Sequence, residues 1–211
     1  MFVYDWPASG RTVGESNVEN SVFYTRLGQR IIHILETRMS LGQLYEVDMR
    51  LRPSGASGML VSSLDAYRRY EREDAWIWEH QALVRARAIA GDPQLMQRLE
   101  QVRREQLCTP RDAQTLAREV TAMREKMRAH AGVTADDVEL DLKQGCGAIV
   151  DIEFMVQYAV LAWSEQEPEL AHWSDNVRIL ETLAETGRVP PASCEALTEA
   201  YLALRSATHE L

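Results

Sequence analysis

The segment Tyr45-Glu46-Val47-Asp48-Met49-Arg50-Leu51-Arg52 alternates apolar and charged residues without a break. Successive side chains of an extended chain point to opposite faces, so this alternation predicts a half-buried β-strand over residues 44–52. The segment 53–58 (Pro-Ser-Gly-Ala-Ser-Gly) is rich in turn residues and would end the strand. A strand needs partners for its backbone groups, so the segment predicts that this part of the chain contains a β-sheet.

The polar face of this predicted strand carries one carboxylate and two guanidinium groups. Asp48, Arg50 and Arg52 are spaced two residues apart and therefore share one face. A carboxylate is a hard oxygen ligand that suits Mg²⁺, and arginine can bind phosphate oxygens through two N–H groups at once. From the spacing alone, a solvated face with weak ion pairs is the preferred interpretation. A phosphate- and metal-binding face is the alternative.

Apolar residues recur at helical spacing on both sides of this segment. Residues 2–5 (Phe-Val-Tyr-Asp) are typical of the end of a strand, and residues 18–35 predict a helix with one buried apolar stripe. Further helices are predicted over about 62–73, 75–90, 93–106, 109–132, 149–163, 174–187 and from 190 onward, with a short strand near 59–61. Thr109-Pro110 and Ser174-Asp175 are the clearest helix start signals. The pattern predicts an α+β protein with a long helical second part.

Two further segments, 76–87 and 141–154, combine charged residues with helical periodicity. Arg85 and Arg87 in the first segment point to different sides of the predicted helix, whose tryptophans are interpreted as core residues. Gly145-Cys146-Gly147 in the second segment could let the backbone approach a phosphate, although such a short glycine pattern is weak evidence. For the first segment the preferred interpretation is an amphipathic helix.

Two acids of the second segment lie on its predicted helix. Glu153 falls on the apolar stripe, where a carboxylate is costly unless it is paired. We therefore expect Glu153 to contact a basic group, namely Lys143, Arg85 or Arg87. Asp151 lies in the first turn, where the helix dipole favours negative charge, and a simple first-turn acid is an equally good interpretation of it.

The composition excludes several classes of function. The chain has 211 residues and a net charge of -9, which argues against a large nucleic-acid footprint because duplex binding needs a basic face. Its three cysteines form no C-x-x-C pair and are interpreted as reduced thiols. No apolar run approaches the roughly 20 residues that span a bilayer. The five histidines are scattered, and no catalytic triad can be argued from them. A small phosphorylated ligand remains possible.

Taken together, these segments resemble the glutamine-synthetase adenylyltransferase family. The resembling segments are 45–55, 78–87, 123–128, 143–154 and 173–181, and they follow the family's order over nearly the whole chain. The resemblance implies the C-terminal part of a polymerase-β-like nucleotidyltransferase domain, with a mixed sheet, in residues 1–92. It implies an all-α helical bundle domain in residues 93–211. The enzymes of this family have two similar halves, and segments 123–128 and 173–181 are most similar to the C-terminal, AMP-attaching half.

The resemblance also implies a reaction and a set of site residues. The family transfers AMP from ATP to a tyrosine of glutamine synthetase in the cytoplasm, with Mg²⁺ and under the influence of the PII signalling protein, and so regulates nitrogen assimilation. Asp48 would be the third acid of the family's metal site and a catalytic residue. The residues assigned to cofactor binding are Arg50, Arg52, Lys143, Asp151 and Glu153.

Departures from the family pattern limit this expectation. The family's Gly-Ser loop and Asp-x-Asp pair are expected just before residue 2, so we expect the chain to be truncated at both ends and catalytically incomplete. The segment 145–148 (Gly-Cys-Gly-Ala) replaces a run that usually ends in two adjacent glycines. Two alternatives stay open: the chain could belong to the adenylyl-removing half, or it could be a helical module that docks glutamine synthetase or PII.

Overall fold

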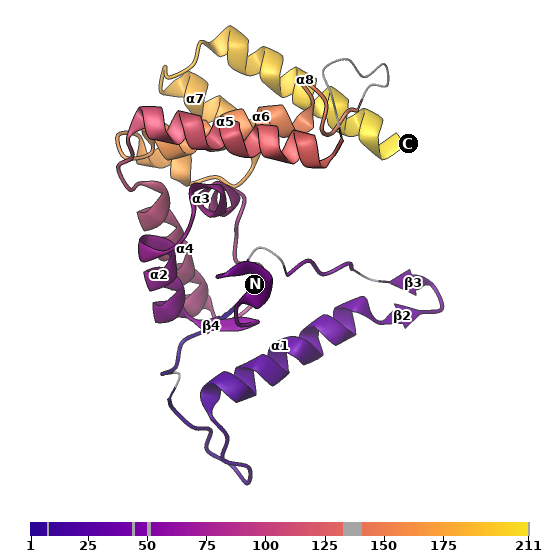
Figure 1. Cartoon of the computed structure of the whole chain (residues 1–211), viewed down its shortest axis with the longest axis vertical. Coiled ribbons are helices and arrows are strands. Elements are labelled where there is room, and N and C mark those ends of the chain that lie inside the picture. Colours follow the sequence, from indigo (N-terminus) through magenta and orange to yellow (C-terminus); the bar gives the residue numbers. More distant parts are fainter. Residues whose placement is uncertain (8, 44, 50–51, 133–140, 211) are drawn as a thin grey trace. The chain divides into compact units, whose positions relative to one another are not determined.

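A computed structural model of the chain describes residues 1–7, 9–43, 45–49, 52–132 and 141–210 (Figure 1). The described residues form eight α-helices and four short strands. The helices are α1 (Asn20–Glu36), α2 (Leu64–Glu73), α3 (Ile77–Val84), α4 (Pro93–Leu107), α5 (Ala113–His130), α6 (Ile149–Trp163), α7 (Asn176–Glu185) and α8 (Pro191–Glu210). The strands are β1 (Phe2–Tyr4), β2 (Arg38–Met39), β3 (Gly42–Gln43) and β4 (Val61–Ser63), and the 3-10 turns are η1 (Gly55–Ser57) and η2 (Pro168–Ala171).

The chain divides into two compact units. The N-terminal unit comprises Met1–Ala75 and Ala90–Leu99, and the helical unit comprises Trp76–Ile89 and Glu100–Leu211. The mixture of strands and helices is consistent with the predicted α+β class. The described sheets have two strands each, so the mixed sheet of a nucleotidyltransferase remains an expectation. None of the described helices is both long and apolar enough to cross a membrane.

A parallel pair of short strands forms the centre of the N-terminal unit. β1 pairs with β4, with Phe2 opposite Val61. Helix α1 packs on this pair at Gly28, where an added Cβ would lie 3.0 Å from Val61 Cγ2 and 3.3 Å from a Phe2 ring carbon. Only glycine allows this approach without moving its neighbours. The prediction of a strand at residues 2–5 is confirmed for Phe2–Tyr4, and Tyr4 at its end is buried.

The strand predicted over residues 44–52 is wrong for its described part. Residues 45–49 adopt no strand, while residues 44, 50 and 51 lie outside the described residues. Alternation suits the side chains of a strand, but a strand also needs a neighbour that satisfies its backbone groups. The nearby strands are paired elsewhere, β1 with β4 and β2 with β3. The short antiparallel hairpin of β2 and β3 follows directly after α1 (Figure 1).

Helix α1 begins and ends close to the predicted residues, but the prediction of its buried stripe is wrong. Val22, Phe23, Leu27 and Ile34 are 39–60% exposed. The buried positions of the helix are Asn20 and Gly28. The helix contacts the strand pair through the face that carries Gly28, and these apolar side chains remain partly exposed.

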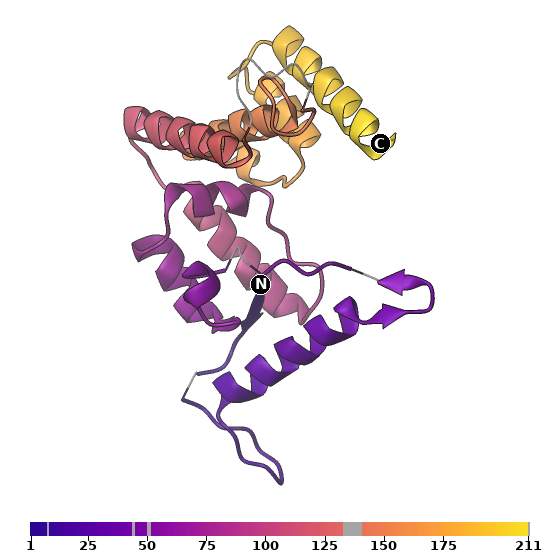
Figure 2. The same ribbon diagram turned by 45° about the vertical axis from the view of Figure 1, so that its right-hand side comes forward.

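Helices α3, α5, α6, α7 and α8 make up most of the helical unit. α6 contacts each of the other four, and α5 lies beside it in both views (Figures 1 and 2). The central position of α6 follows from its sequence, because apolar residues occupy almost all of its faces. Ile152, Val156 and Val160 are at most 2% exposed. Helix α7 packs on α6, and its residues Ile179 and Leu183 are equally buried. A helix that is apolar all round is typical of a core position.

The helix starts show where local sequence signals are reliable. The start predicted at Thr109-Pro110 is wrong, because α5 begins at Ala113 with Asp112 as its N-cap. The start predicted at Ser174-Asp175 is confirmed, because the Asp175 carboxylate accepts hydrogen bonds from Val177 N and Arg178 N at 3.0 and 3.2 Å. An aspartate satisfies orphan N–H groups better than a threonine at this position.

Removal of the Asp175 cap should weaken the helical unit modestly. We expect Asp175→Ala to lower the free energy of unfolding by about 1 kcal/mol, because two N–H groups of α7 lose their acceptor. Urea unfolding followed by far-UV circular dichroism measures this difference. The neighbouring change Ser174→Ala is the control and should alter stability by less than about 0.5 kcal/mol. Equal effects of the two changes would contradict the capping role.

Candidate functional site

The predicted catalytic acid lies at the surface of the N-terminal unit. Asp48 is exposed in the segment 45–49, which follows the β2–β3 hairpin. This segment is attached to α1 by a hydrogen bond from Tyr45 N to the carbonyl oxygen of Leu35 at 3.2 Å. Arg50 lies outside the described residues. A shared strand face for Asp48, Arg50 and Arg52 is therefore not formed by the described residues.

Arg52 is tied to the turn that follows it. The side chain is half-buried; its Nη1 donates to the Met49 carbonyl oxygen at 2.5 Å and its Nε to the Gly58 carbonyl oxygen at 3.3 Å. Gly58 is required there, since a Cβ would lie 1.8 Å from the carbonyl oxygen of Pro53. These bonds fix the turn next to Asp48. A role of Arg52 in steadying phosphates stays a prediction.

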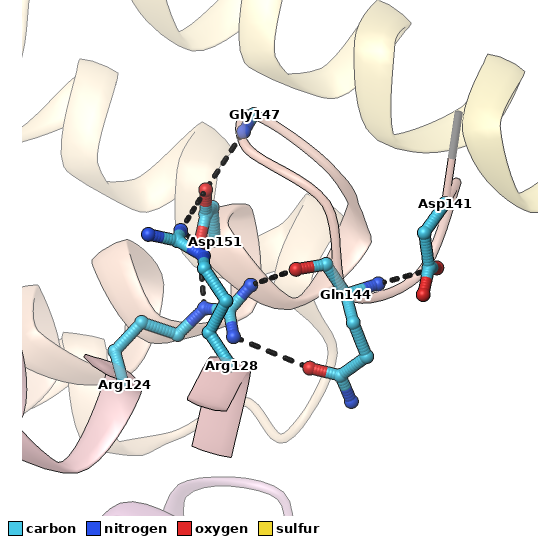
Figure 3. A network of polar contacts seen from close by, with 6 residues as sticks. All are labelled: Arg124, Arg128, Asp141, Gln144, Gly147 and Asp151. Carbon is cyan, nitrogen blue, oxygen red and sulfur yellow. Dashed lines mark hydrogen bonds and ion pairs between the residues drawn. The ribbon is translucent and has the colours of Figure 1, made fainter. Parts of the chain in front are cut away.

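In the helical unit, Asp151 is the centre of a polar network (Figure 3). Its Oδ1 accepts from Arg124 Nε at 2.5 Å, and both of its oxygens lie 3.1 Å from Arg128 Nη2. Its Oδ2 also accepts from the backbone N–H of Gly147 at 2.7 Å. Arg124 further donates to the carbonyl and side-chain oxygens of Gln144 at 2.8 and 3.2 Å. The network joins α5, α6 and the loop before α6.

The electrostatics of this network favour an ionised carboxylate. Burial by itself would raise the pKa of Asp151, but the Gly147 N–H and the two guanidinium groups outweigh it, and the pKa lies below its ordinary value of 3.8. In the same loop, Asp141 Oδ1 accepts from the N–H groups of Lys143 and Gln144 at 2.8 Å. These backbone hydrogen bonds lower the pKa of Asp141. Both acids therefore stabilise the loop in their charged forms.

The local sequence explains why the loop adopts this shape. Gly147 has φ +74°, a left-handed conformation that favours glycine, and its N–H reaches Asp151. At Gly145, a Cβ would lie 2.5 Å from the carbonyl oxygen of Asp141. Each glycine is thus needed for the fold of the loop. A phosphate-binding role is not required to explain either of them.

Glu153 belongs to a different cluster from Asp151. Its Oε1 lies 3.4 Å from Arg85 Nη1 and 3.4 Å from the hydroxyl of Tyr201. The expectation that Glu153 meets a basic group is confirmed for Arg85, but Glu153 is 28% exposed rather than fully buried. The Lys143 side chain is exposed. Lys143, Asp151 and Glu153 therefore do not converge on one site.

The arginines that hold Asp151 were not among the predicted site residues. Arg124 and Arg128 are four residues apart on α5, and Arg124 follows the buried Val120 by four. Residues with this spacing share a helix face. Arg124 is only 8% exposed, and a buried guanidinium needs acceptors. The sequence signal for the network is the position of Arg124 one turn after Val120, on the helix face that also buries Leu116.

The described residues do not supply the donors that the expected metal centre requires. Among the described residues, no group of three or more His, Cys, Asp or Glu side chains could hold a metal ion. Asp48 supplies one surface carboxylate, whereas the expected site needs several acids that bridge two ions. The described carboxylates therefore do not fit such a centre.

Two family comparisons bear on the identity of the chain. Residues 1–102 match the model of the glutamate–ammonia ligase adenylyltransferase family. Residues 114–211 match the model of the GlnD PII-uridylyltransferase family. Both matches support assignment to the nucleotidyltransferases. The first, which contains Asp48, supports an adenylyltransferase of glutamine synthetase in particular. The second match was not among the expectations from sequence.

Proposed function

We propose that this chain forms part of an enzyme that transfers AMP from ATP to a tyrosine of glutamine synthetase. The observation that carries the proposal is the family match over residues 1–102, which spans the whole Asp48–Arg52 segment. The resemblance of segments 123–128 and 173–181 to the AMP-attaching half selects addition rather than removal of AMP. The structure gives residues of both segments supporting roles, since Arg124 and Arg128 hold Asp151 and Asp175 caps α7.

The proposed chemistry is a phosphoryl-type transfer. The tyrosine oxygen attacks the α-phosphorus of ATP, the bond to the β-phosphate oxygen breaks, and pyrophosphate leaves. Asp48 is exposed and is the proposed acceptor of the tyrosine proton. Arg50 and Arg52 are the proposed partners of the phosphate oxygens. In this proposal Mg²⁺ is the counter-ion of ATP, glutamine synthetase is the protein substrate and PII is the regulator.

The test uses ATP labelled at the α-phosphate, purified glutamine synthetase, and the full product of the gene that encodes this chain. Label should appear on glutamine synthetase and be released by phosphodiesterase. We expect Asp48→Asn to lower the rate by about 100-fold, because an amide cannot accept the proton. Glu46→Gln is the matched control, since Glu46 is an exposed acid two residues away, and its rate should stay unchanged.

Other outcomes would redirect the proposal. Label that passes from UTP to PII instead would favour the activity named by the second family match. Phosphate-dependent loss of AMP from adenylylated glutamine synthetase, without addition, would favour the adenylyl-removing half. Equal rates for Asp48→Asn and the unchanged protein would remove Asp48 from the catalytic site. The uridylylation assay uses labelled UTP with PII, and the removal assay uses glutamine synthetase that already carries labelled AMP, with phosphate added.

A further inference from the structure

The helical unit contains a cavity of about 760 Å³ between α5, α6, α7 and α8. Most of its walls are apolar. They include Val120, Phe154, Val156, Trp163, Leu180 and Leu197. Cavities of this size, lined mainly by apolar groups with a few polar ones, are typical of small-molecule sites. All of its walls belong to the helical unit.

One part of the cavity wall is charged. Arg124, Arg128, Asp151 and the exposed Glu125 all line it. Arg124 is occupied by Asp151 and Gln144, to which it donates through Nε, Nη1 and Nη2. Arg128 is less fully used, because its hydrogen bonds to Asp151 come from Nη2 alone. Its Nη1 makes no hydrogen bond to a described residue, and the side chain is 26% exposed, so the guanidinium keeps a donor for a ligand.

We propose that this cavity binds a small amphipathic anion, with an apolar body against the helix walls and an acidic group on Arg128. The N–H groups of a guanidinium form charge-assisted hydrogen bonds with acidic groups, and these are stronger than neutral hydrogen bonds. A fully polar ligand would leave the apolar walls uncovered. A neutral apolar ligand would leave the Arg128 donor unsatisfied. The site shares no residue with the Asp48 segment, so it does not depend on the proposed transfer reaction.

Two fluorescent dyes that differ by one acidic group test the proposal. The probes are 8-anilinonaphthalene-1-sulfonate and N-phenyl-1-naphthylamine, which lacks the sulfonate. The sulfonate dye should bind the unchanged chain about tenfold more tightly than the neutral dye. Arg128→Gln should weaken binding of the sulfonate dye about tenfold and leave the neutral dye unaffected. Arg118→Gln is the matched control, because Arg118 is exposed on the same helix and does not line the cavity.

A cavity-narrowing variant separates this site from the exposed apolar side chains of the N-terminal unit. Ala117 lines the cavity and is partly exposed, and Ala117→Phe narrows the cavity while replacing no residue of the Asp151 network. It should weaken the binding of both dyes to the cavity by about tenfold, with little change in melting temperature. If Arg128→Gln fails to fold, the dye preference of the unchanged chain and the effect of Ala117→Phe decide between the outcomes. Dye binding that Ala117→Phe leaves unchanged, or no preference for the sulfonate, would overturn the proposal.

Discussion

Replacement of Arg103 by alanine is expected to lower the free energy of unfolding of the helical unit by about 4 kcal/mol. Arg103 is 4% exposed, and its guanidinium donates to four backbone carbonyl oxygens. The acceptors are Leu83 and Val84 at the end of α3, Ala171 in η2, and Trp173, all at 2.8–3.0 Å. Without the guanidinium, several of these carbonyl groups remain buried with no donor, and each costs free energy.

Urea unfolding followed by tryptophan fluorescence measures this effect, since Trp76, Trp78, Trp163 and Trp173 lie in the helical unit. The matched control is Arg104→Ala on the same helix, which should cost less than about 1 kcal/mol. Arg103→Lys should give an intermediate loss, because one ammonium group cannot reach all four acceptors. A loss below about 1 kcal/mol for Arg103→Ala would show that the carbonyl groups find other donors.

The helices were predictable from sequence because their signals are local. Apolar spacing and the Asp175 cap require only neighbouring residues, and both predictions are confirmed for α7. The strand predicted over residues 44–52 depended on a partner strand, which alternation alone cannot supply. The apolar side chains of α1 were predicted to be buried because of their helical spacing. Burial also requires another element that packs against them, and the spacing does not show whether one is present. Gly28 instead marks the face of α1 that contacts the strands.

In the candidate site, too, local features could be predicted from the sequence, whereas contacts between distant segments could not. The pairing of Glu153 with a basic residue followed from the cost of burying a carboxylate, and Arg85 is its partner. The partners of Asp151 come from a helix more than twenty residues earlier in the chain, so its spacing indicated only a first-turn acid. The sequence does not indicate the role of Arg103, because its acceptors are backbone carbonyl groups, which every residue carries. Its role is visible only once α3, α4 and η2 are packed.

Replacement of Asp151 by asparagine is expected to lower the free energy of unfolding by about 3 kcal/mol at neutral pH. The change leaves Arg124, which is 8% exposed, without its anionic partner and weakens the bonds from Arg128 and Gly147. Asp151 itself is 21% exposed, so the estimate is taken at the low end of the range for broken buried pairs. Glu165→Gln, a change at an exposed acid of the same unit, is the control and should have little effect.

The pH dependence of this difference tests the ionic character of the network. The pKa of Asp151 is lower in the folded chain than its ordinary value of 3.8. Its stabilising contribution is therefore complete above the unfolded pKa and is lost as the pH falls through the folded pKa. Asparagine does not titrate, so the stability difference between the unchanged chain and Asp151→Asn should shrink as the pH falls below about 4. Urea unfolding of both proteins at neutral and at acidic pH measures it. A difference that stays constant across this range would mean that the network is held by neutral hydrogen bonds rather than by charge.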